Sequence, residues 1–260
     1  MKNDSKMPDQ AAVPLKIELL FPEVCNLFGD LFNMTYLQHC LPEAEFIHTH
    51  MSREPRFVTE DVDMIFMAPM TELTQERVIE KFMPHKARIA ELMEKDTVFL
   101  FTGNAMEVLY RYIEDTDGRK TEGLGLLPCY AKRDMMSRIN SVFLGRFEGE
   151  EFTGFKTQFT KAYPDHDQYA FISREKGMGM NEDCAFEGFH LHNFFGSYLT
   201  GPILILNPPF TQYLLGLLGA RAHQGALGQQ GVPAQKLVYD EAIRAAYTQR
   251  LKQYHAHVKK

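Results

Sequence analysis

The segment over residues 97–110 constrains the fold of this chain more than any other. Residues 98–101 form an apolar run of β-branched and aromatic residues, typical of a buried strand, which ends abruptly at Thr102-Gly103-Asn104. A helical pattern follows directly. A strand that turns sharply into a helix holds one side chain above the sheet edge, beside the free N–H groups of the helix N-terminus. The segment therefore predicts an α/β fold with residue 102 in this exposed position.

The order of the other segments predicts a three-layer α/β sandwich of the flavodoxin-like type. Strands are expected over residues 15–21, 45–48 and 63–67, and helices over 31–41 and about 72–94, the second kinked by Pro84. Alternation of this kind favours a mostly parallel central sheet. After Gly118 the chain changes to short segments with turns, which predicts a strand-rich second half with strands over 142–147, 152–158 and 169–173.

Composition divides the chain into four parts. Residues 1–14 form a polar N-terminal tail, 15–219 the main domain, and 220–234 a linker rich in Gly, Gln and Ala. Residues 235–260 place apolar side chains at spacings of three and four, which predicts an amphipathic C-terminal helix. This helix is expected to dock on its own domain, on a second copy of the chain as a homodimer, or on a partner.

Charge and hydropathy exclude several classes of protein. The formal net charge of −6 argues against a nucleic-acid surface, which normally requires a basic patch. No apolar run approaches the roughly 20 residues that span a bilayer, and the polar N-terminus lacks the apolar region of a signal peptide. A cytoplasmic protein without a membrane span is therefore expected.

The cysteines and histidines give no metal site. Four scattered cysteines without Cys-x-x-Cys spacing predict free thiols rather than zinc ligands or a disulfide framework. His190 and His192 would point to one face of a strand, near Glu187, but no further ligand is apparent. Partial burial with ordinary hydrogen bonds is the favoured interpretation, and no metal or cofactor is expected.

Several segments, taken in order, resemble one known family. They are Leu20-Phe-Pro-Glu-Val-Cys-Asn-Leu-Phe-Gly-Asp30, the helix with Gln75, the elbow at Thr102, Glu122-Gly-Leu-Gly-Leu-Leu127, and Ser197-Tyr-Leu-Thr-Gly-Pro-Ile-Leu204 before Asn207-Pro208. Over roughly residues 15–219 the chain resembles the class I glutamine amidotransferases of the cobyric-acid-synthase-like (CobB/CobQ-like) branch. Within that branch it is most similar to the glutaminase subunit of lipid II isoglutaminyl synthase.

The resemblance implies that two catalytic positions are substituted. The family carries a cysteine at the elbow and a histidine in the motif Tyr-Leu-His-Gly-Pro, where this chain has Thr102 and Thr200. Glutamine hydrolysis needs a thiolate nucleophile and an imidazole that moves the proton. The family's Gly-Gly-Gly turn, part of the oxyanion pocket, is replaced by Met67-Ala-Pro-Met70, in which Pro69 has no N–H.

The resemblance also implies a set of pocket-lining residues. Gly103 and Asn104 follow the elbow residue, and Asp30 follows the first strand, where it either caps the next helix or lines the pocket. Arg138 lies where the family has an arginine for the glutamine carboxylate. Arg133 and Arg146 remain alternatives for that role.

Two classes of function follow. The preferred interpretation is a degenerate, non-catalytic amidotransferase-like subunit that binds or regulates a Mur-ligase-like ATP-dependent partner in cell-wall amidation. The alternative is an active amidotransferase that supplies ammonia for isoglutaminyl or cobyric acid synthesis, with Thr102 activated by a base that the sequence does not identify. A third is a sensor that binds glutamine or a related small molecule without hydrolysing it.

Overall fold

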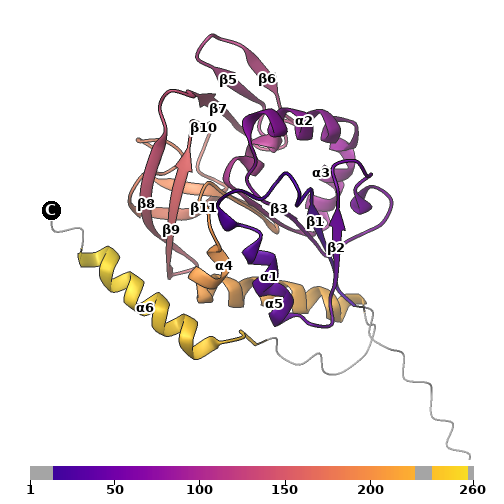
Figure 1. Ribbon diagram of the computed structural model, residues 1–260, viewed down its shortest axis with the longest axis vertical. Coiled ribbons are helices and arrows are strands. Elements are labelled where there is room, and N and C mark those ends of the chain that lie inside the picture. The colour runs from indigo at the N-terminus through magenta and orange to yellow at the C-terminus, as the bar shows by residue number, and fades with distance from the viewer. Residues whose placement is uncertain (1–13, 226–235, 257–260) are drawn as a thin grey trace, which may run out of the picture.

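The computed structural model describes residues 14–225 and 236–256. A nine-stranded sheet in the order β2-β1-β3-β4-β13-β12-β11-β8-β9 forms the centre of the molecule (Figure 1). Its strands are β1 Lys16–Leu20, β2 Glu45–Thr49, β3 Met64–Met67, β4 Val98–Thr102, β8 Ile139–Phe147, β9 Glu150–Gln158, β11 Ala170–Lys176, β12 Phe186–Leu191 and β13 Phe194–Ser197.

Helices cover both faces of this sheet, so the predicted three layers are confirmed. Side chains of α2 (Glu72–Phe82) and α3 (Lys86–Glu94) join one hydrophobic core. Those of α1 (Phe32–Cys40), α4 (Ile203–Leu206) and α5 (Pro208–Gly225) join the other. The predicted kink at Pro84 is a 3-10 turn, η3 (Met83–His85), which separates α2 from α3. Two further 3-10 turns are η1 (Leu27–Gly29) and η2 (Arg56–Val58).

The central sheet is mixed, which corrects the expectation of a mostly parallel one. All pairings from β2 to β13 are parallel, whereas all pairings from β13 to β9 are antiparallel. β3 and β4 are buried along their whole length, as strands covered by helices on both faces should be. The antiparallel half arises because β8 and β9 are joined by a tight turn, which cannot connect parallel strands.

A second, smaller sheet lies beyond the carboxyl ends of the parallel strands. Its order is β10-β7-β5-β6, with β5 Tyr112–Asp115, β6 Lys120–Glu122, β7 Cys129–Arg133 and β10 Thr160–Pro164. On edge strand β9, Phe155 forms an antiparallel bridge with Thr200, which lies three residues after β13. The parallel strand ends, β9 and the small sheet therefore surround one region.

The C-terminal helix α6 (Asp240–Ala256) packs against its own domain (Figure 1). Ile243 is buried, the Tyr247 hydroxyl donates to the carbonyl of Glu151 at 2.6 Å, and Arg250 donates to the carbonyl of Leu206 at 2.6 Å. The homodimer predicted through this helix stays a prediction.

Helix α5 runs to Gly225, past the expected start of the linker at 220. Residues 226–235 of the predicted linker and residues 1–13 of the predicted tail lie outside the described residues.

We predict that Ile243→Ala lowers the free energy of unfolding by about 2 kcal/mol, because it removes buried methyl groups from the contact between α6 and the domain. Urea denaturation measures this loss. Gln249→Ala on the exposed side of the same helix is the matched control and should change stability by less than about 0.5 kcal/mol. Equal stability of the two variants would contradict the docking of α6.

Candidate functional site

The elbow has a relaxed backbone and buries its first residue. Thr102 ends β4 with φ −110° and ψ 151°, and Gly103 takes the left-handed conformation with φ +57°. The segment that follows is a 3-10 helix, η4 (Gly103–Leu109). Thr102 is 0 % exposed, which corrects the expectation that it stands free above the sheet edge. The turn is present as predicted, but its first side chain points into the protein.

Pro69 closes the elbow from the side of the cavity. A Cβ on Gly103 would lie 2.7 Å from the Pro69 ring and 3.5 Å from the Thr200 methyl group, so only glycine fits between them. The Asn104 carboxamide fixes the Pro69 turn, because it accepts from the Met70 N–H at 3.0 Å and donates to the Met70 carbonyl at 2.9 Å. The N–H of Met70 is thus occupied and Pro69 has none, so neither is free to stabilise an oxyanion.

Asp30 lies behind the elbow and brings Thr102 and the Thr200 segment together. One carboxylate oxygen of Asp30 accepts from the N–H of Gly201. The other, Oδ2, and the Thr102 hydroxyl are both buried without a hydrogen-bond partner among the described residues. Helix α1 has no side-chain N-cap, so the interpretation of Asp30 as a helix cap is wrong. Thr200 itself donates from its N–H to the carbonyl of Phe155 at 2.8 Å.

Burial raises the pKa of the Asp30 carboxyl from 3.8 to about 7, against the opposing effects of the nearby Thr102 hydroxyl and the Gly201 N–H. A carboxylate that shares its pocket with a hydroxyl and titrates near neutral pH is a candidate general base. Sequence reasoning left the base for Thr102 unidentified, because Asp30, which follows η1, and Thr102, which ends β4, are far apart in the chain.

A cavity of about 190 Å³ lies on the other side of Pro69 and Gly103. Its lining includes the predicted residues Pro69, Gly103, Asn104 and Arg138, but not Asp30, Thr102 or Thr200. The predicted site residues therefore fall into two groups, one at the cavity wall and one buried behind it. Among the arginines considered for the carboxylate role, Arg133 and Arg138 reach the cavity, whereas Arg146 pairs with Glu175 elsewhere.

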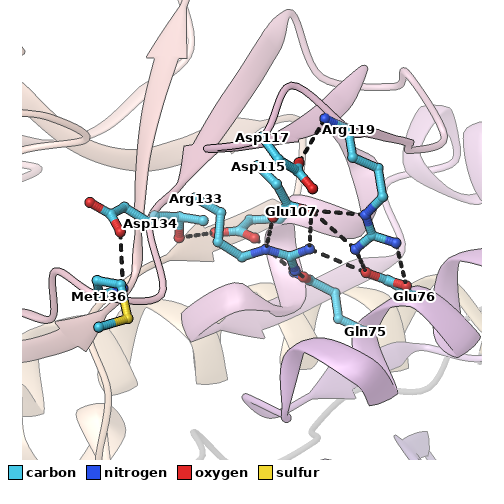
Figure 2. A network of polar contacts seen from close by, with 10 residues as sticks. Gln75, Glu76, Glu107, Asp115, Asp117, Arg119, Arg133, Asp134 and Met136 are labelled. Carbon is cyan, nitrogen blue, oxygen red and sulfur yellow. Dashed lines mark hydrogen bonds and ion pairs between the residues drawn. The ribbon is translucent and has the colours of Figure 1, made fainter.

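The floor of this cavity is a polar network that sequence reasoning missed (Figure 2). The buried carboxyl of Glu107 accepts from Gln75 Nε2 at 2.8 Å, and also from the hydroxyls of Tyr198 and Thr160. Burial raises the pKa of Glu107 despite these hydrogen bonds. One local signal was available, since Glu107 is the single charged residue in the apolar stretch over 105–110.

Arg133 joins this network to the small sheet. Its Nε donates to Asp115 at 2.7 Å, and its guanidinium also contacts Glu76 at 3.2 Å and Gln75 at 3.4 Å (Figure 2). Arg119 adds a second contact to Glu76, at 2.6 Å. Helix α2 and the small sheet are thus held together by paired charges. Arg138, in contrast, is exposed and stacks over the Phe159 ring at 4.7 Å.

The two histidines considered as ligands make separate contacts. His190 stacks on Phe195 with a 4.5 Å separation of the ring centroids, and burial lowers its pKa. His192 lies near Glu94, and Glu187 pairs with Lys156 instead. Within the described residues, no group of three potential ligands is arranged to hold a metal ion. None of the described helices combines the length and the apolar character needed to cross a bilayer.

The fold is that of the class I glutamine amidotransferases. The model of the CobB/CobQ-like glutamine amidotransferase domain matches residues 16–207, and the chain belongs to this family. Over 90 % of its length it also superimposes on 92 % of a glutamine amidotransferase from Thermotoga maritima, with a TM-score of 0.50 and 10 % identity, which supports the fold alone.

Two curated relatives are similar in sequence. The lipid II isoglutaminyl synthase (glutamine-hydrolyzing) subunit GatD of Streptococcus pneumoniae is 27 % identical over 74 % of this chain and 76 % of its own length. The same subunit from Staphylococcus aureus is 24 % identical over 73 % of this chain and 78 % of its own length. The predicted resemblance is confirmed at the level of the family and of these relatives.

The raised pKa of Asp30 predicts a specific dependence of stability on pH. The folded protein holds this proton to higher pH than the unfolded chain, so the contribution of Asp30 to stability falls as the pH rises from about 4 to about 7. Asn at this position keeps the acceptor for Gly201 and places a donor near Thr102. We expect Asp30→Asn to raise the midpoint of thermal unfolding by several degrees at pH 8 and to leave it nearly unchanged at pH 4.

Glu43→Gln, at an exposed site, is the control for loss of a carboxylate, and its midpoint should follow that of the parent at both pH values. A lower midpoint for Asp30→Asn at pH 8 would show that the ionised carboxyl stabilises the fold, contrary to this prediction.

Proposed function

We propose that this protein is a subunit of a glutamine amidotransferase complex in peptidoglycan amidation, and that it does not itself hydrolyse glutamine. The family and the two GatD relatives support the first part, since both relatives are subunits of lipid II isoglutaminyl synthase. The elbow supports the second part, that the protein does not hydrolyse glutamine. There a buried threonine hydroxyl lies behind Pro69 at the position of the family's nucleophile.

The chemistry of the site agrees with this proposal. A threonine hydroxyl is a weak nucleophile unless an adjacent base activates it, and Thr200 has no group that takes up a proton near neutral pH. The turn at Pro69 offers no donor to an oxyanion, because the N–H of Met70 is held by Asn104. The positions of the nucleophile, the proton carrier and the oxyanion donor are therefore all altered around the elbow.

The proposed partner is a Mur-ligase-like ATP-dependent protein. A subunit that lacks its own hydrolytic chemistry contributes through binding, either by stabilising the ligase or by controlling its use of ammonia from another source. The partner meant is the Mur-ligase-like protein encoded in the same genome as this chain. A stable complex of the two purified proteins in size-exclusion chromatography is the direct test.

We predict that the purified protein, alone and with its partner, releases ammonia from glutamine at the background rate. Loss of the nucleophile or of the base from a catalytic triad costs about 10⁶ in turnover, so activity should lie below detection. A coupled glutamate dehydrogenase assay measures the release. Thr102→Ala is the matched control and should be indistinguishable from the parent.

One observation favours a second candidate, an active amidohydrolase with Thr102 as nucleophile. Asp30 lies beside the Thr102 hydroxyl and titrates near neutral pH, as a general base should. Ammonia release that is abolished by both Thr102→Ala and Asp30→Asn would establish this candidate and reject the non-hydrolytic proposal.

Restoring the two side chains alone should not restore hydrolysis. We predict that Thr102→Cys combined with Thr200→His remains inactive, because Pro69 still covers the elbow, and that adding Pro69→Gly and Asn104→Gly allows measurable release of ammonia. The same assay compares the two variants. Hydrolysis by the double variant would contradict the blocking role of Pro69.

A further inference from the structure

The edge strand β9 has one uncovered end, and it faces the cavity. Three residues along β9 have outward backbone groups that are already paired. The carbonyl of Glu151 accepts from Tyr247 of α6, the N–H and carbonyl of Thr153 pair with the Asn207 carboxamide at 2.8 and 3.0 Å, and the carbonyl of Phe155 accepts from Thr200. Outward groups at Glu151, Thr153 and Phe155 are therefore occupied by contacts within the chain.

Thr157 is the next residue on the same side. In an antiparallel pair the backbone groups of alternate residues point away from the neighbouring strand, so the outward pairing at 153 and 155 places the N–H and carbonyl of Thr157 outward as well. Among the described residues these two groups have no hydrogen-bond partner. Thr157 also lines the cavity, across from Gly103 and Asn104. The open end of β9 is thus directed into the space beside the elbow.

The neighbouring side chain offers a second, independent signal. Gln158 is 8 % exposed and lines the same cavity, and its Oε1 has no hydrogen-bond partner among the described residues. Its Nε2 donates to the Thr160 carbonyl at 2.6 Å, which leaves one N–H free. A carboxamide with one free acceptor and one free donor is complementary to a peptide group, and an unpaired buried acceptor is costly unless a ligand satisfies it.

Exposed apolar side chains lie near this opening, although polar residues, Glu72 among them, also line the cavity. Phe28 stands at the cavity with a left-handed backbone, φ 60°, and is 46 % exposed. Phe155 and Val142 are directly opposite each other on β9 and β8 and are 42 % and 53 % exposed. Bulky residues in the left-handed region cost energy and persist where the surroundings or a function require them. The exposed guanidinium of Arg138, held against Phe159, adds a positive charge at the mouth.

We propose that the open end of β9 binds an extended peptide segment of the ligase-like partner, which pairs with the backbone of Thr157 as an added strand and fills the cavity beside Gln158. This inference rests on the proposed function, because it assigns the surface through which that subunit binds its partner. Strand addition fits the site because main-chain hydrogen bonds supply affinity, while the cavity and the apolar rim select the side chains. An acidic residue in the segment would pair with Arg138.

The test combines a backbone variant with hydrogen exchange. Thr157→Pro removes the outward N–H without breaking the ladder to β8, and proline is tolerated on an edge strand in this position. Thr157→Val keeps the N–H and is the matched control. With the purified Mur-ligase-like protein as the probe, calorimetry should show at least tenfold weaker binding for Thr157→Pro and unchanged binding for Thr157→Val. Thermal unfolding checks that both variants fold.

Hydrogen exchange at the Thr157 amide of the unmodified protein gives a readout that does not depend on any variant. Exchange should be fast in the free protein and at least tenfold slower in the complex. A complex in which Thr157 exchange is unchanged and Thr157→Pro binds normally overturns the inference and leaves the proposed function intact. An amide already protected in the free protein also overturns it, since the chain's own residues then cover the edge. If the two proteins do not associate, the proposed partner and this inference both fall.

Discussion

The arrangement around the elbow depends on one buried ion pair, between Lys156 on β9 and Glu187 on β12. Both side chains are fully buried. Burial lowers the pKa of Lys156 and the adjacent Glu187 opposes this, so the pair must stay together or leave an uncompensated charge in the core. Lys156 also donates to the Gly179 carbonyl at 2.7 Å, and Glu187 accepts from the Ser197 hydroxyl at 3.1 Å and the Tyr198 N–H at 2.6 Å.

These contacts bind four segments of the chain: β9, the loop at Gly179, β12 and the chain that leaves β13. Because Tyr198 is fixed at its N–H by Glu187 and at its hydroxyl by Glu107, the following residues are directed past Phe155 toward Asp30. The chain after Tyr198 carries Thr200, which bridges to Phe155, and Gly201, which donates to Asp30. The network on the cavity floor and the ion pair therefore share one residue, Tyr198, and form a continuous polar layer beneath the pocket.

Local patterns predicted the features that depend on neighbouring residues. The strand ending at Thr102, the kink at Pro84 and the amphipathic stripe that contains Ile243 all follow from sequence within one or two turns. The sequence did not predict the burial of Thr102, because this depends on the packing of Pro69 against Gly103, more than thirty positions away. The antiparallel half of the sheet was missed for a related reason, since its pairing depends on the turn between β8 and β9 rather than on hydrophobic periodicity.

Two buried oxygens behind the elbow have no hydrogen-bond partner among the described residues, and stability alone does not explain them. Asp30 Oδ2 and the Thr102 hydroxyl lie buried together, and Asp30 Oδ1 accepts from the Gly201 N–H, so an apolar residue at position 30 would leave that N–H unpaired. A core shaped by stability alone does not favour such a pair, because each unsatisfied buried polar group lowers stability by about 1–3 kcal/mol. Polar groups that reduce stability are typical of present or former functional sites. In this protein the pair lies behind Pro69, apart from the cavity in which we propose that the partner binds.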